Sequence, residues 1–352
     1  MAKIRVVLTD DSSVARGLLR SFLESDGGIE IVGEASNGAE AVRLVGELRP
    51  DLVTMDLEMP VMGGMDAIRE IMATHAVPIL VVSSVADAKN ACAAVACGAL
   101  DAISKPEMDA VSGFVAKVKM LAKIPVITHL RLRASAKPMI EELQPPTPAI
   151  SPSDTAEAAP RADSTCLFAI ASSTGGPQVL SSILGSLPRV FPCPILIAQH
   201  IADGFAHGMA EWLAGVCKLP VRLAREGELL MAGTVYVSPS EANLAVTPAR
   251  RMTLVPRLPG EIYHPTCDVL LASVAAVYGH QGVGIILTGM GSDGAAGMSK
   301  IRDAGGVTLA QDETSSVIFG MNKVAIDRGG VQQVLPASEI SQTMCRLAGL
   351  SV

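Results

Sequence analysis

The chain has 352 residues, of which 49% are apolar and only 3% are aromatic. A single core rarely grows to this size, so two domains are expected, with cores built mainly from aliphatic side chains. The net charge of −7 and a pI near 5.4 argue against nucleic acid as a main partner, because that requires clustered Lys and Arg. No apolar run approaches the about 18 residues of a membrane helix, so direct membrane insertion is not expected.

The seven cysteines are scattered, with no C-x-x-C pair and no Cys/His cluster at zinc spacing. Such a set is typical of reduced core thiols in a cytosolic protein. The N-terminal residues reach Asp10 and Asp11 before the apolar region of a signal peptide could develop. We therefore expect a cytoplasmic protein with reduced cysteines.

The first 125 residues alternate short apolar runs with stretches of helical apolar spacing. Five β/α pairs whose strands are apolar on both faces predict a parallel, flavodoxin-like sheet covered by helices on both sides. Strands are expected at 4–8, 29–34, 52–55, 79–82 and 101–103, and helices at 14–22, 39–48, 66–72, 86–95 and 111–121.

A second β/α series begins at Cys166, after a segment over 137–164 that is rich in Pro, Ala, Ser and acidic residues. That composition has little to bury and is typical of an extended linker. The second series predicts a doubly wound, Rossmann-like α/β domain. Its strands are expected at 167–171, 195–198, 235–237, 283–287 and 307–309, and its helices at 177–186, 205–215, 268–278 and 295–304. The domain boundaries are placed at 1–126, 127–164 and 165–352.

Polar residues follow several strands of the first predicted sheet. Asp10 and Asp11 come after the first strand, Asp56 after the third, Ser83 ends the fourth and Lys105 follows the fifth. The carboxyl ends of parallel strands share one edge, where ligands bind. Carboxylates gathered there repel one another unless a cation lies among them, and hard oxygen ligands suit Mg²⁺.

The motifs TDDS, MDLEMP, SS and SKP carry these residues, and together they resemble the signature of response-regulator receiver domains. The resemblance implies that Asp56 accepts a phosphoryl group, that Asp10 and Asp11 help it to bind Mg²⁺, and that Ser83 and Lys105 contact the phosphoryl oxygens. A histidine kinase of chemotaxis would then be the phosphodonor. Ala102 stands where receivers commonly carry an aromatic switch residue, so the relay from the phosphoryl group is less predictable than its formation.

Three chemically useful side chains follow strands of the second predicted domain. In LFAIASSTGGP, Ser173 ends an apolar strand before two glycines and a helix-starting proline. His200 ends the next strand, and Asp293 lies in a glycine-rich loop after a later one. Each alone is more often structural. Together they fit a serine hydrolase, in which a histidine takes the serine proton and a carboxylate orients that histidine.

The segments ASSTGGP, QHIADGF, HPTCDVLL, ILTGMGSDGAAGM and LAQDETSSVIFGM resemble the catalytic domain of chemotaxis protein-glutamate methylesterases, the CheB family, which also carry a receiver in front. The resemblance implies that Ser173 is the nucleophile, His200 the general base and Asp293 its orienting group. Backbone N–H groups near Met290 would bind the oxyanion, with support from Thr174.

The implied activity is hydrolysis of glutamate methyl esters on methyl-accepting chemoreceptors, with release of methanol, and deamidation of certain glutamines. No cofactor is implied for the esterase reaction. The domain order suggests that the unphosphorylated receiver packs over the active-site edge and that phosphorylation of Asp56 opens it.

Two other interpretations remain open at this stage. The loop Gly289–Gly294 is formally G-x-G-x-x-G, with Asp312 about 20 residues beyond, as a dinucleotide-binding fingerprint requires. This interpretation leaves Ser173 and His200 without a role. The other is a non-enzymatic response regulator whose second domain only docks partners.

Overall fold

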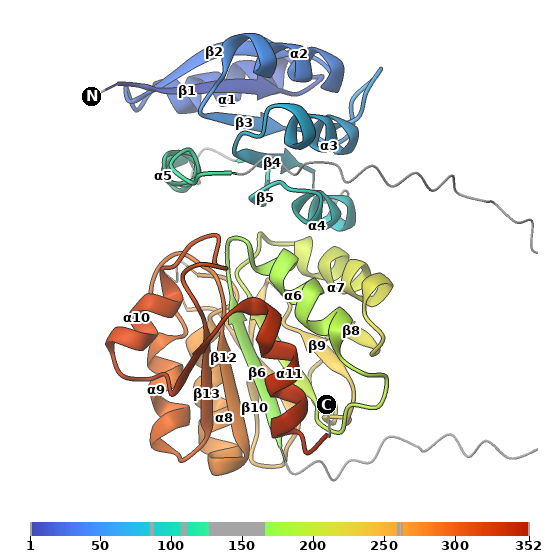
Figure 1. The fold of residues 1–352 in the computed structure, drawn as a ribbon, viewed down its shortest axis with the longest axis vertical. Helices are drawn as coiled ribbons and strands as arrows, with labels where there is room; N and C mark the ends of the chain where they lie inside the picture. Colours follow the sequence, from blue (N-terminus) through green and yellow to red (C-terminus); the bar gives the residue numbers. More distant parts are fainter. Residues whose placement is uncertain are drawn as a thin grey trace, which may run out of the picture.

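The computed structural model describes residues 2–84, 88–106, 111–126, 166–258, 261 and 263–350. They form an N-terminal α/β unit (residues 2–126) and a C-terminal α/β unit (residues 166–350), which lie one above the other in Figure 1. The expected linker at 127–164 lies outside the described residues. Within these ranges, no helix is both long and apolar enough to cross a bilayer.

The N-terminal unit is built on a five-stranded parallel sheet with the order β2-β1-β3-β4-β5. This order confirms the flavodoxin-like prediction, and it places the ends of β1 and β3 side by side. Both faces are buried because α1 and α5 cover one and α2, α3 and α4 the other. The elements are β1 Ile4–Thr9, α1 Ser13–Glu24, β2 Ile29–Ala35, α2 Gly38–Leu48, β3 Leu52–Met55, α3 Gly64–Thr74, β4 Ile79–Ser83, α4 Ala88–Ala96, β5 Asp101–Ser104 and α5 Val111–Leu121.

The C-terminal unit has a seven-stranded parallel sheet with the order β14-β13-β12-β6-β7-β9-β8. The chain first winds outward from β6 through β7 and later returns to β12 on the other side of β6. This makes a doubly wound sheet with a switch point beside β6, where such folds bind ligands. The strands are β6 Leu167–Ser172, β7 Ile195–Gln199, β8 Val221–Leu223, β9 Val235–Val237, β12 Gly282–Ile286, β13 Val307–Gln311 and β14 Gln333–Leu335.

Two layers of helices cover this sheet. One core lies beneath α6, α7 and α11, and a second beneath α8, α9, α10 and the hairpin β10–β11. The sequence did not predict the short β8 and β14, the hairpin, α10 or α11. The remaining elements are α6 Gly176–Ser186, α7 Phe205–Val216, β10 Ala242–Val246, β11 Met252–Pro256, α8 Cys267–Tyr278, the 3₁₀ turn Gly279–Gln281, α9 Ala295–Asp303, α10 Met321–Asp327 and α11 Ala337–Leu347.

The expectation that all cysteines are reduced is wrong for one pair. Cys166 and Cys193 form a disulfide, with their Cα atoms 5.7 Å apart. The sheet explains the pairing: Phe168 lies opposite Ile195 in the β6–β7 register, so the residues two positions earlier on each chain also face one another. The other five cysteines are free thiols.

The two units meet mainly where α4 packs against α7. The approach is close at Gly208, where an added Cβ would lie 2.4 Å from the backbone nitrogen of Lys89. Cys92 of α4 belongs to a buried cluster formed otherwise by the C-terminal unit, and Phe205 of α7 is buried among residues of the N-terminal unit. The interface is therefore an apolar, closely packed one.

Candidate active site

Three strand ends converge at the switch point of the C-terminal sheet. Ser173 and His200 directly follow the paired residues Ser172 and Gln199 on β6 and β7, and the N–H of His200 donates to the Ser172 carbonyl at 2.9 Å. On the other side of β6, the N–H of Ser173 donates to the carbonyl of Thr288 at 3.0 Å, just after β12. The sheet thus brings the predicted serine and histidine together.

The two adjacent serines have different environments. Ser172 is fully buried, and its Oγ donates to Gln199 Oε1 at 2.7 Å. Ser173 is 8% exposed, and its Oγ makes no hydrogen bond with any residue that the structure describes. Ser172 therefore has a structural partner, whereas the hydroxyl of Ser173 remains available for chemistry.

The glycines after Ser173 are required by close packing. Gly175 has φ +79°, and a Cβ there would lie 2.6 Å from Val317. A Cβ on Gly176 would lie 2.0 Å from Gln199 Oε1. Only glycine permits this tight turn from β6 into α6, which holds Ser173 at the start of the helix.

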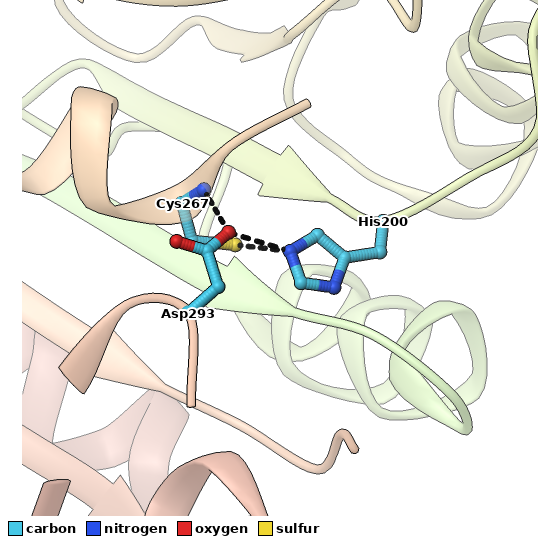
Figure 2. Close-up of side chains that lie close together, drawn as sticks. All are labelled: His200, Cys267 and Asp293. Atoms are coloured by element: carbon cyan, nitrogen blue, oxygen red, sulfur yellow. Dashed lines mark hydrogen bonds and ion pairs between the residues drawn. The ribbon is translucent and has the colours of Figure 1, made fainter. Parts of the chain in front are cut away.

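His200 and Asp293 form a hydrogen-bonded pair. His200 Nε2 lies 2.8 Å from Asp293 Oδ2, and both side chains are largely buried. Figure 2 shows Nε2 directed at Asp293, with the other ring nitrogen on the far side of the imidazole. If Asp293 is ionised, it accepts the Nε2 proton, so Nδ1 of the neutral ring keeps a free lone pair. The pair has the base-and-orienter arrangement that serine activation requires.

Backbone N–H groups complete the binding of the Asp293 carboxylate. Oδ2 accepts from Cys267 N at 2.6 Å, and Oδ1 accepts from Asp268 N and Gly294 N, both at 3.0 Å. Burial alone would raise the pKa of Asp293, but the hydrogen bond and charge of His200 and the N–H groups outweigh it and lower that pKa from 3.8. Asp293 is therefore an ionised, fixed acceptor for the imidazole.

Cys267 is a neighbour of this pair that the sequence did not single out as a site residue. Figure 2 shows its Sγ beside His200 Nε2, at 3.4 Å. The same Sγ lies 3.4 Å from the carbonyl oxygen of Ala198. His200, Cys267 and Asp293 have the ligand types of a metal site. Burial and the charge of Asp293 raise the pKa of the Cys267 thiol well above 9.0. However, both oxygens of Asp293 already accept backbone N–H groups, and His200 Nε2 bonds to Oδ2. The cluster fits a buried hydrogen-bonded pair better than a metal centre.

Two backbone N–H groups near Ser173 are candidates for oxyanion binding. Those of Thr174 and Met290 donate to no acceptor among the described residues. Thr174 follows Ser173, the position that supplies such a donor in many hydrolases. Met290 is 48% exposed in the loop after β12, whose Gly289 packs so close that a Cβ would lie 2.6 Å from Ser173 Cβ. Both predicted residues thus lie around the candidate nucleophile.

The N-terminal unit reaches this site directly. Asp101, the first residue of β5, accepts a hydrogen bond from Thr174 Oγ1 at 2.8 Å and pairs with Lys117 Nζ of α5 at 2.7 Å through the same oxygen, Oδ2. Val317, which packs against the Gly175 turn, also contacts the core of the N-terminal unit. No sequence pattern predicted the Asp101 contact, because the contact depends on the docking of the two units.

The dinucleotide interpretation of Gly289–Gly294 does not fit the structure. The loop does join β12 to α9, but the Asp293 carboxylate already accepts the N–H of Gly294 at the N-terminus of α9, where a pyrophosphate would bind. Asp312 is engaged with Ser315, whose backbone N–H donates to Oδ1 at 3.0 Å. An anion at this helix would meet a carboxylate.

The predicted phosphorylation residues also converge at one edge of the N-terminal sheet. Lys105 Nζ lies 2.8 Å from Asp56 Oδ2 and 2.7 Å from Asp10 Oδ2, and Ser83 Oγ donates to Asp56 Oδ1 at 3.1 Å. Burial would lower the pKa of Lys105, but its hydrogen bonds to the two carboxylates raise it overall. The side-chain oxygens of Asp10, Asp11 and Asp56 lie within 4.8 Å of one another. Asp10 Oδ2 is buried and pairs with the Lys105 ammonium, and the three clustered carboxylates offer the oxygen ligands that suit a hard cation.

Family models match both units of the chain. Residues 168–344 match the family model of the CheB methylesterase, and residues 6–112 match that of the response regulator receiver domain. A protein-glutamate methylesterase/protein-glutamine glutaminase 3 of Paramagnetospirillum magneticum is 53% identical over 99% of this chain and 98% of its own length. The chain belongs to the CheB methylesterase family. The resemblance drawn from the motifs is thereby confirmed.

Other members of the CheB family extend this finding. A protein-glutamate methylesterase/protein-glutamine glutaminase of Pyrococcus abyssi is 36% identical over 98% of this chain and 93% of its own length. The crystal structure of the Thermotoga maritima CheB methylesterase catalytic domain is 34% identical, with a TM-score of 0.51, and covers 52% of this chain and 98% of that one. Membership of a methylesterase family leaves the non-enzymatic alternative without support.

Proposed function

We propose that this CheB-family chain hydrolyses glutamate methyl esters on chemoreceptors, deamidates receptor glutamines, and is controlled by phosphorylation of Asp56. The observation that carries the proposal is the buried His200–Asp293 pair at the end of β7, next to the end of β6 where the Ser173 hydroxyl makes no hydrogen bond among the described residues. The domain division at 1–126, 127–164 and 165–352 belongs to the same proposal, with a receiver in front of a catalytic domain.

The acylation step follows from the orientation of the imidazole. Asp293 accepts the Nε2 proton of His200, so Nδ1 is the nitrogen that removes the proton of Ser173. Ser173 Oγ then bonds to the ester carbonyl carbon, and the imidazolium is stabilised by the ionised Asp293. The N–H groups of Thr174 and Met290 donate to the oxyanion, and removing one such donor typically costs about 10²–10³ in rate.

Collapse of the tetrahedral intermediate breaks the ester C–O bond. His200 returns its proton to the departing methoxide, so methanol leaves and an acyl-Ser173 ester remains. A water molecule, deprotonated by the same nitrogen, attacks this ester and regenerates Ser173 with free glutamate. With a glutamine substrate the same steps release ammonia, because the amide nitrogen takes the proton instead of methoxide.

Phosphorylation is proposed to occur on Asp56. Asp10, Asp11 and Asp56 would hold Mg²⁺, which neutralises negative charge at the phosphoryl group when it is bound. Lys105 and Ser83 contact the Asp56 carboxylate, which supports a role for both in binding phosphoryl oxygens. A histidine kinase of the chemotaxis pathway is the proposed phosphodonor.

Control of the esterase is proposed to act through the docking of the two units. In this structure Asp101 of the receiver binds Thr174, the residue after the nucleophile, and α4 packs on α7. A receptor helix needs access to the same strand ends. Phosphorylation would weaken this docking and expose the site. The proposed location is the cytoplasm, where the kinase and the receptor ester sites would meet the enzyme.

The decisive experiment is methanol release from esterified receptor membranes, with and without a phosphodonor. Wild type is expected to release methanol and to do so faster with the donor. Ser173→Ala should lose release, whereas Ser172→Ala should retain much of it, because its hydroxyl is engaged with Gln199. Release that survives in Ser173→Ala would refute the assigned nucleophile, and Asp56→Asn should respond to no donor.

A further inference from the structure

Tyr263 contacts His200 on the face of its imidazole ring. The two ring centroids are 4.9 Å apart and the planes are inclined by 17°, which is a stacked arrangement. Nothing in the sequence pattern indicated this residue, since it lies in a loop before α8 and not at a strand end. The hydrogen bond to Asp293 holds the edge of the His200 imidazole but leaves the imidazole free to tilt about that bond. Stacking against Tyr263 restricts this tilt.

The loop that carries Tyr263 is held from two sides. The N–H of Ile201 donates to the carbonyl of His264 at 2.8 Å, which ties the loop to the chain just after His200. The N–H of Thr266 donates to Asn243 Oδ1 of β10 at 2.7 Å. Both bonds lie within three residues on the C-terminal side of Tyr263, and they hold the backbone that presents the tyrosine to His200.

The hydroxyl end of Tyr263 lies against the loop after β12, which contains Met290. Gly291 has φ +95°, and a Cβ on it would lie 2.3 Å from the Tyr263 hydroxyl. The phenol makes no hydrogen bond among the described residues. Tyr263 thus contacts the His200 imidazole with its ring and lies against Gly291, the residue after Met290, with its hydroxyl.

Resting on the proposed esterase function, we infer that Tyr263 is a positioning residue that holds the His200 imidazole by stacking. In the ground state the Tyr263 ring keeps His200 Nε2 directed at Asp293, which leaves His200 Nδ1 to accept the serine proton. In the transition state the imidazole becomes a cation, which an aromatic face also stabilises. Both effects act on the chemical step, so they should appear in kcat and not in KM.

The test compares Tyr263→Phe, which keeps the ring, with Tyr263→Leu, which removes it. Methanol release is measured with saturating phosphodonor, and rates are divided by the concentration of Ser173 that a serine-directed phosphonate labels, so that unfolded protein is not counted. Tyr263→Leu should lower kcat about 3- to 10-fold with KM within twofold, as expected for loss of one aromatic pair. Tyr263→Phe should stay within twofold of wild type.

A matched control is Tyr278→Phe, since Tyr278 lies at the end of α8 over Arg250, away from the site. It should leave kcat and KM unchanged. A second readout is the ring-current shift of the His200 imidazole protons in NMR, assigned by their loss in His200→Gln. These signals should be shifted in wild type and Tyr263→Phe alike, and should move toward unshifted values in Tyr263→Leu.

Three outcomes would overturn the inference. Equal losses in Tyr263→Phe and Tyr263→Leu would assign the effect to the hydroxyl, and a rise in KM alone would assign it to substrate binding. His200 signals that do not move in Tyr263→Leu would show that no stacking occurs. A wild-type enzyme that releases no methanol would instead refute the proposed function, while the NMR comparison would still test the stacking.

Discussion

Cys92 offers a direct measure of whether the receiver leaves the catalytic domain on phosphorylation. It lies on α4, is 2% exposed, and belongs to a core cluster made otherwise by catalytic-domain residues. Burial, together with the negative charge of Asp101, raises the pKa of the Cys92 thiol from 9.0 to about 12. Separation of the two domains would return the thiol to water.

The expected change in reactivity follows from that pKa difference. Only the thiolate reacts with an alkylating reagent, and three pKa units correspond to about a thousandfold lower thiolate fraction at pH 8. In the docked state Cys92 should therefore be almost inert toward iodoacetamide. If a phosphodonor opens even about one molecule in ten, the rate of labelling at Cys92 should rise about a hundredfold, since the open fraction then dominates the reaction.

The assay is timed alkylation followed by peptide mass spectrometry, with and without beryllofluoride and Mg²⁺ to imitate the phosphoryl group. Cys217 at the end of α7 is the internal control, because burial within the catalytic domain raises its pKa to about 11 and its labelling should not change. Asp56→Asn should abolish the response at Cys92. An esterase that is activated while Cys92 stays inert would refute opening at the α4–α7 contact.

Three further predictions concern other contacts. Asp101→Ala removes a charge-assisted hydrogen bond to Thr174, worth about 1.5 kcal/mol, and should raise methanol release without phosphodonor up to about tenfold while leaving the activated rate nearly unchanged; an unchanged basal rate would contradict a role in docking. The disulfide between Cys166 and Cys193, 27 residues apart, should stabilise the catalytic domain by about 3–4 kcal/mol, so reduction or Cys166→Ser should lower the urea midpoint; identical midpoints would refute this. Because the pKa of Asp293 is lowered from 3.8, its ionised form contributes stability above about pH 4 that is lost as pH falls through the folded-state pKa. In urea titrations from pH 5 to 2, Asp293→Asn should therefore lose less stability than wild type. Parallel curves of stability against pH for the two proteins would contradict this.

The predictable part of the fold was the part with a local signal. Strands such as β3 and β6 are mostly apolar runs buried on both faces, and the parallel sheet follows from their alternation with helices. The hairpin β10–β11 was missed because Asn243 and Thr253 interrupt its apolar residues. The three-residue strands β8 and β14 carry too few residues for any period to show, and only their neighbours in the sheet define them.

The site shows the same division. Ser173, His200 and Asp293 could be proposed because each follows a strand, and parallel strands end at one edge. Cys267, Tyr263 and the Asp101 contact could not, since tertiary packing alone brings them to His200 and Thr174. The disulfide did have a signal: its two cysteines stand just before two adjacent strands, but recognising it required the β6–β7 register.

The position of α4 has a consequence for how the pairing of receiver and esterase domain can change in evolution. β4 ends at Ser83, which donates to the Asp56 carboxylate, and α4 begins at Ala88 and forms the contact with α7. Along the chain, only a few residues thus separate Ser83 at the Asp56 site from the helix that contacts the catalytic domain. The fit between a receiver and its own esterase domain then depends largely on one nine-residue helix. In duplicated genes, an exchange of this helix or a few substitutions in it would be enough to change that fit.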